Sequence, residues 1–305
     1  SKQLGYSRDA EREADRFGLS TLQNAGFDPL GMEAFFERLQ QNNRWYENAS
    51  TAYISTHPMT SERMSDMQNR TRHMSPVTHR DSMDFFLVKA RARVLQETTY
   101  DGWLKVSKSF ENELKRHPAG YSLVATQYGL SVAYAKMNQK DKALTAIRAA
   151  KAASKENSVI LDKHLAELTY QVAKTQAQKD QALALAKSTC NQYPYSGLAA
   201  SNYVELLFQS GKHQELVDYL RNQSALSRSN PDYHMYLARS YEALGKKSMA
   251  FAATGDMYAL LDNPRAAVYQ FELAQKANDG DFYIMSEIDA KLREQRQKVL
   301  DQKKD

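Results

Sequence analysis

The chain has 305 residues, of which 42% are hydrophobic and 25% are charged, so it can fold into two compact units or one extended array. Its formal charge of +5 is small for this length. Basic residues alternate with acidic ones, with no aromatic-rich basic stripe and no zinc-finger spacing, which argues against a nucleic-acid partner. No apolar stretch approaches the ~20 residues that a transmembrane helix needs.

The sequence starts at Ser1 without an apolar signal core. We therefore expect an upstream part, which would include any targeting segment, to precede it. The single cysteine, Cys190, cannot form an internal disulfide, and a buried structural thiol is expected there.

The pattern predicts an all-α protein. Glycine and proline are scarce, at 12 and 7, and apolar residues recur every three or four positions. Asp28 before Pro29 is typical of a helix start. A polar stretch with Pro76 predicts a linker over 76–82, which would separate an N-terminal part, 1–75, from a C-terminal part, 83–305.

The C-terminal part contains a repeat. Ala143, Ala182, Leu216 and Ala250 are spaced 39, 34 and 34 residues apart, and 34 is the tetratricopeptide period. The longer step predicts about five extra residues in a loop near "SKENS". We expect a tetratricopeptide solenoid in which the helix over 249–261 serves two successive helix pairs. A charged C-terminal helix would cap its open end.

The stretch "EREAD" places two carboxylates, Glu11 and Asp15, four residues apart on one helix face. Like charges at this spacing destabilise a helix, so a cation should compensate them. One interpretation is an ion-pair ladder with the neighbouring residues Arg8, Arg12 and Arg16. The other is a metal ion bound by Glu11.

The segments "SRDAEREADRFGLSTLQNAGFDPLGMEAFFERL" and "STHPMTSERM" resemble the second half of a gluzincin domain from the HtpX and CAAX prenyl protease family of zinc metallopeptidases. Their combination with a C-terminal tetratricopeptide array resembles a periplasmic branch of that family. The resemblance implies that Glu11 is a zinc ligand and that Asp15 orients a ligand histidine. It also implies that Arg63 pairs with a carboxylate of the active-site wall rather than transferring protons.

None of the seven histidines is followed by Glu, so the HExxH motif of that family is absent from this sequence. We expect HExxH upstream in a full-length parent, and we expect this chain alone to bind zinc weakly and to be inactive. His57 in "STHP" has two interpretations. It is a turn residue, or it is a fourth zinc ligand that displaces water and keeps the enzyme latent.

The repeat register predicts a protein-binding groove on the inner helices, although ordinary solenoid packing would place the same residues there. The candidates are Tyr128, His164, Glu167, Phe208, Met235 and Arg239. The resemblance implies a metalloendopeptidase in outer-membrane protein assembly and quality control in the periplasm. Its partners would be stalled outer-membrane proteins and the barrel assembly machinery. The alternatives are a non-enzymatic tetratricopeptide scaffold and a holdase chaperone.

Overall fold

The computed structural model describes residues 2–43, 61–78, 80–223 and 229–302. Every helix or strand assigned in these ranges is an α-helix, which confirms the predicted all-α class. The chain divides into two compact units, residues 1–82 (unit 1) and 83–305 (unit 2). The expected linker, 76–82, falls at the end of unit 1. No helix in the described ranges is both long enough and apolar enough to span a membrane.

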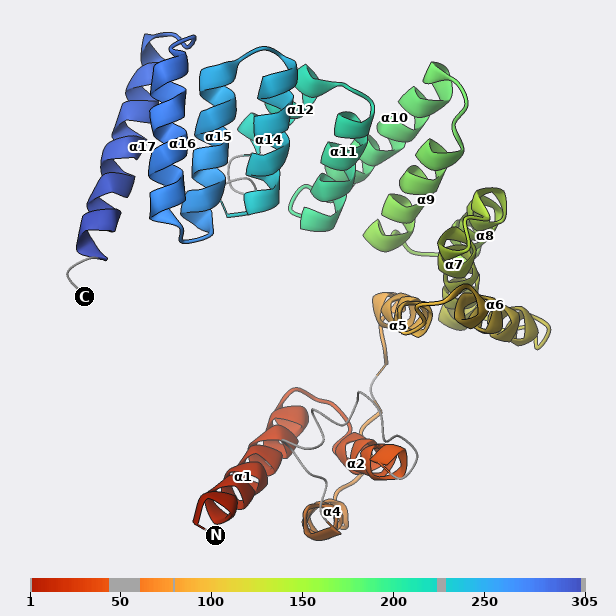
Figure 1. Ribbon diagram of the computed structural model, residues 1–305. Coiled ribbons are helices and arrows are strands. Elements are labelled where there is room, and N and C mark those ends of the chain that lie inside the picture. The colour runs from red at the N-terminus through yellow and green to blue at the C-terminus, as the bar shows by residue number, and fades with distance from the viewer. Residues whose placement is uncertain (1, 44–60, 79, 224–228, 303–305) are drawn as a thin grey trace. The chain divides into compact units, whose positions relative to one another are not determined.

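Unit 1 contains α1 (Lys2–Asn24), α2 (Leu30–Asn43) and α4 (Ser61–Thr71) (Figure 1). The Asp28 carboxylate accepts a hydrogen bond of 3.0 Å from the Leu30 amide, which satisfies a backbone donor at the start of α2. Among the described residues of this unit, one leucine, one phenylalanine and two methionines form a buried cluster, namely Leu19, Phe36, Met64 and Met67.

Unit 2 is a row of helices in which each packs against its sequence neighbours (Figure 1). The helices are α5 (Met83–Leu95), α6 (Tyr100–Leu114), α7 (Gly120–Lys136), α8 (Lys140–Ala153), α9 (Val159–Val172), α10 (Gln176–Gln192), α11 (Gly197–Gln209), α12 (His213–Asn222), α14 (Pro231–Ala243), α15 (Lys247–Leu260), α16 (Pro264–Ala277) and α17 (Phe282–Asp301). As predicted for 249–261, α15 packs against both α14 and α16.

The repeat positions are the points of close helix approach. Ala143, Ala182 and Leu216 are fully buried. Gly211 and Gly245, which are also 34 residues apart, form turns with φ of +67° and +75°, a backbone region that glycine adopts without strain. The period therefore marks both the packed faces and the turns of successive helix pairs.

Gly129 on α7 allows a close approach to α6. A Cβ atom at this position would lie 2.5 Å from the ring of Phe110, which is itself 1% exposed. The ring of Phe110 thus occupies the space that any larger residue at 129 would need.

We expect Gly129→Ala to destabilise unit 2 by about 1–3 kcal/mol, because a packed core does not absorb an extra methyl group. Native-state hydrogen exchange of the α6 and α7 amides measures this loss. Gly197→Ala is the matched control, since no atom lies within 4 Å of the added Cβ atom. Equal protection of these amides in the two variants would contradict the close packing of the Phe110 ring against Gly129.

Candidate functional site

Arg63 of α4 brings together the two carboxylates of α1. Its Nε and Nη2 atoms each lie 2.7 Å from an oxygen of Asp15, and its Nη1 atom lies 3.0 Å from Oε2 of Glu11. The planar guanidinium matches the two oxygens of Asp15 in a forked, bidentate pair. The structure therefore unites three predicted site residues whose positions are up to 52 apart in sequence.

This ion-pair cluster is largely buried. The side chains of Arg63, Asp15 and Glu11 are 11%, 8% and 17% exposed. The guanidinium also lies 5.4 Å from the centroid of the Phe36 ring on α2, so this arginine of α4 contacts both α1 and α2. Charges removed from water need such complete pairing, because a lone buried charge is strongly unfavourable.

Arg12, a member of the alternative ladder, pairs instead with Asp9 and with Glu62 of α4. The cation that the described contacts place between Glu11 and Asp15 is the Arg63 guanidinium. Whether Glu11 binds zinc and whether Asp15 orients a ligand therefore stay predictions, as does any role of Arg63 in catalysis.

The described residues alone do not fit a zinc ion. Within the ranges that the structure covers, no group of three or more His, Cys, Asp and Glu side chains is arranged to hold a metal. A protein zinc site needs at least three such ligands. Glu11 is a candidate for one of them, and the predicted ligand His57 lies outside the described residues.

Next to the cluster, unit 1 has a wide apolar hollow of about 870 Å³. Gly18 and Leu22 of α1 line it, and so do Met32 and Phe35 of α2. Phe35 is 54% exposed, although a large apolar side chain in a small unit would normally be buried. This face is therefore suited to be covered by further protein.

Four of the six predicted groove residues of unit 2 fall into two groups. Tyr128 and His164 are 1% and 5% exposed and belong to the interior, so they offer little surface to a partner. Glu167 and Phe208 are partly exposed, and Phe208 packs edge-on against the ring of Tyr236, with 5.3 Å between the ring centroids. A binding role for these residues remains a prediction.

Met235 and Arg239 of α14 line one hollow of about 410 Å³ with residues of α15 and α16. Phe251 and Met257 of α15 are two of its apolar walls, and the sequence analysis did not single them out. The sequence pattern that could have predicted them is the i, i+3, i+6 spacing of Phe251, Thr254 and Met257, because this spacing places the three residues on one side of the helix.

Comparison with known proteins shows what each unit resembles. Residues 2–71 match the model of peptidase family M48, a family of zinc peptidases, and unit 2 is a tetratricopeptide-like helical array. The chain is a homologue of the beta-barrel assembly-enhancing protease of Escherichia coli (strain K12). The two are 26% identical over 265 residues, which cover 84% of this chain and 50% of that protein.

The protein of the same name from Yersinia pestis is 35% identical over 88 residues, or 29% of this chain and 18% of that one. The chain thus spans about half the length of the Escherichia coli relative. Among solved structures, a tetratricopeptide repeat protein of Thermus thermophilus aligns with a TM-score of 0.42. It is 17% identical, with 69% of this chain and 99% of that chain covered.

We expect Arg63→Ala to destabilise unit 1 by about 3–5 kcal/mol, because it leaves the Asp15 and Glu11 carboxylates buried without their cation. Hydrogen exchange of the α1 and α4 amides measures the change. Arg63→Lys should recover only part of the loss, since lysine cannot form the bidentate pair.

The matched control is Arg70→Ala, which removes a half-exposed pair with Asp66 on the same helix. Its cost should stay below about 1 kcal/mol. If the two alanine variants were equally stable, the buried cluster would not hold unit 1 together.

Proposed function

We propose that this chain is the C-terminal portion of a zinc metalloendopeptidase whose repeat array recruits polypeptide substrates. In the whole protein, Glu11 supplies one zinc ligand and Asp15 orients a second ligand, a histidine of an upstream HExxH motif. The match of residues 2–71 to peptidase family M48 carries the proposal. Zinc in this site supplies a Lewis acid and an activated water.

The contacts of Arg63 support a positioning role for the cluster. A metal ligand works only if its carboxylate is held in a fixed orientation, and residues around a site commonly provide that restraint. Arg63 restrains Glu11 and Asp15 together, and its own position is fixed by Phe36. The exposed apolar hollow beside α1 and α2 is the surface on which we place the upstream half of the peptidase domain.

For unit 2 we propose that the hollow at Met235 and Arg239 binds extended or partly unfolded polypeptides. Met and Phe side chains adapt to different apolar partners, which suits recognition of many sequences. By similarity to the beta-barrel assembly-enhancing proteases, we propose stalled outer-membrane proteins and the barrel assembly machinery as partners, in the periplasm. His57 is proposed as a regulatory fourth zinc ligand.

A scaffold or a holdase chaperone is the alternative for the array alone. Both would use the same hollow, since apolar side chains of a client need a matching surface in every case. They differ from the main proposal in needing no metal at Glu11.

In the full-length protein, we expect Glu11→Gln to abolish peptidase activity and to lower the zinc content well below one ion per chain. Asp15→Asn should reduce activity about 10–100-fold, the usual effect of disturbing a group that orients a ligand. Casein cleavage and elemental analysis measure the two quantities. Glu13→Gln, an exposed change on the same helix, is the control and should behave like the wild type.

Full activity and zinc in the Glu11 variant would refute the metal role and return "EREAD" to a structural ion-pair segment. Hydrogen exchange of α1 would show in either case whether unit 1 remains folded.

We expect Met235→Ser to weaken the binding of an unfolded outer-membrane β-barrel protein about tenfold, or about 1.4 kcal/mol, because it removes an apolar wall of the hollow. Fluorescence anisotropy of the labelled client, diluted from urea, measures the affinity. Tyr195→Ser removes a large side chain that is 93% exposed outside the hollow and should have no effect. Equal affinities in both variants would exclude the hollow as the binding site.

A further inference from the structure

Helix α9 is the joint between two hydrophobic cores of unit 2. Leu161 and Leu168 belong to the core that α5 to α8 build, whereas Ala166 and Tyr170 belong to the core that α10 to α15 build. The two parts of the array therefore meet through opposite faces of one helix. Any change in how α9 packs alters the angle between them.

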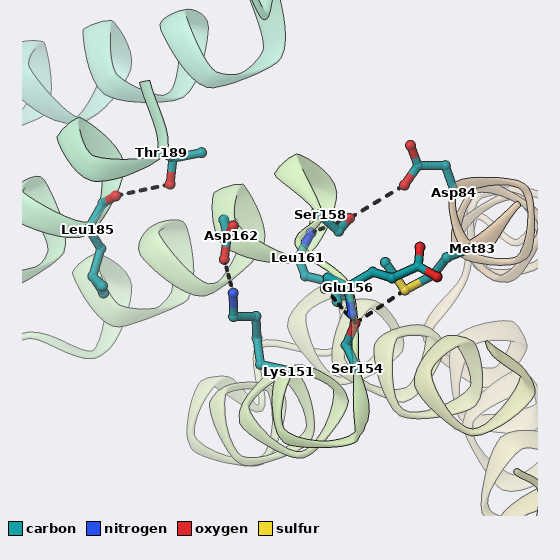
Figure 2. A network of polar contacts seen from close by, with 10 residues as sticks. All are labelled: Met83, Asp84, Lys151, Ser154, Glu156, Ser158, Leu161, Asp162, Leu185 and Thr189. Carbon is teal, nitrogen blue, oxygen red and sulfur yellow. Dashed lines mark hydrogen bonds and ion pairs between the residues drawn. The ribbon is translucent and has the colours of Figure 1, made fainter. Parts of the chain in front are cut away.

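Polar contacts tether the first turn of α9 to the preceding helices (Figure 2). The Ser158 hydroxyl accepts from the Leu161 amide and donates to Asp84 of α5, both at 3.5 Å. Lys151 of α8 forms an ion pair with Asp162. These contacts fix one end of α9, and none involves a group that ordinarily titrates near neutral pH.

Further polar contacts lie in the loop between α8 and α9, where the sequence predicted about five extra residues. The Ser154 hydroxyl donates to the Glu156 carbonyl at 2.7 Å and lies 3.3 Å from the sulfur of Met83 on α5 (Figure 2). The inserted loop thus helps to anchor the start of α9 to α5.

The middle of α9 holds a histidine without a hydrogen bond. His164 is 5% exposed, and among the described residues neither ring nitrogen has a hydrogen-bond partner. Its ring stands edge-on to the ring of Tyr128 on α7, with 5.5 Å between centroids. Oε2 of Glu167 lies 3.7 Å from Nδ1, which is beyond hydrogen-bond range.

The charged groups around this ring act in opposite directions. Glu167 would attract a protonated ring, but it already pairs with Lys163 at 2.6 Å. Arg91 of α5, which donates to the Tyr128 hydroxyl at 3.4 Å, would repel it. Lys151 of α8 is paired with Asp162 of α9. The charged groups that act on the ring are Glu167, Lys163 and Arg91.

We propose that His164 makes this joint acid-sensitive. The neutral ring packs edge-on against Tyr128 of α7, and its protonation weakens that contact, so that α5 to α8 swing relative to α10 to α17 about the tethered start of α9. Acid would thereby change the curvature of the binding array without unfolding it.

The direction of the effect follows from the titration of the ring. Burial lowers the pKa of His164 from its ordinary 6.5, with Lys163 and Arg91 acting the same way, and Glu167 only partly offsets this. The loosened state, with its ordinary pKa, binds the proton more tightly. The stabilising contribution is therefore complete above about pH 6.5 and is lost as the pH falls through the lowered value.

Glu167 stays charged throughout this window. Burial alone would raise its pKa, but His164 and Lys163 outweigh burial and lower the pKa to about 2. Arg91 and Lys163 remain protonated there as well, because their ordinary pKa values lie far above neutrality. His164 is thus the group of this cluster whose ordinary pKa lies between pH 5.5 and pH 7.5.

Hydrogen exchange of the full 305-residue chain at pH 7.5 and pH 5.5, corrected for intrinsic rates, tests the proposal. Amides of α7 and α9 should open more often in acid, by up to about tenfold per pH unit, while α16 and α17 keep their protection. His164→Phe retains a buried ring that cannot be protonated and should remove this response. His117→Asn deletes an exposed imidazole and should leave it unchanged.

An unchanged acid response in His164→Phe, or equal loosening of every helix in unit 2, would overturn the proposal. If His164→Phe does not fold, an NMR titration of the histidines in the wild-type chain tests the proposal instead. A His164 pKa at or above 6.5, or a titration without shifts in the α7 resonances, would overturn it equally.

Discussion

No helix of this chain can bury its apolar face by itself, and the rest of the structure depends on that constraint. In a repeat array each helix pair contacts only its neighbours, so stability is a sum of local interfaces. Small residues at Ala143 and Gly129 let those interfaces close, and the ring of Phe110 fills the space that Gly129 leaves. Because the interfaces are local, one of them can loosen while the others remain packed.

Unit 1 meets the same constraint with a charged contact beside its apolar one. Next to a cluster of four buried apolar side chains among the described residues, Arg63 of α4 pairs with the α1 carboxylates and contacts the Phe36 ring of α2. A buried ion pair adds little net stability compared with apolar packing, but it specifies geometry strongly because it tolerates few orientations. The zinc site that we propose would need Glu11 in one orientation, and the pairing with Arg63 restricts the orientation of this carboxylate.

Unit 2 combines two kinds of contact along one array. Apolar interfaces hold the helix pairs together, and polar contacts also tether the start of α9, where the two cores meet. A polypeptide client that spans several repeats would sense the angle at this joint, because the spacing of its binding points depends on it. The hollow at Met235 lies in α14 to α16, on one side of the joint, so a client held there and on α5 to α8 would cross it.

The sequence by itself determined the all-α class, the 34-residue period and the placement of Glu11 and Asp15 on one helix face, since each follows from the spacing of residues along the chain. Resemblance added that Arg63 meets a carboxylate. Only the tertiary structure decided that Arg63 pairs with both carboxylates, although Asp15 is 48 residues away in the sequence. It also decided that Tyr128 and His164 lie in the interior. The physical reason is that helical periodicity gives the faces of each helix, whereas the packing of neighbouring helices selects which face is buried and which charges meet.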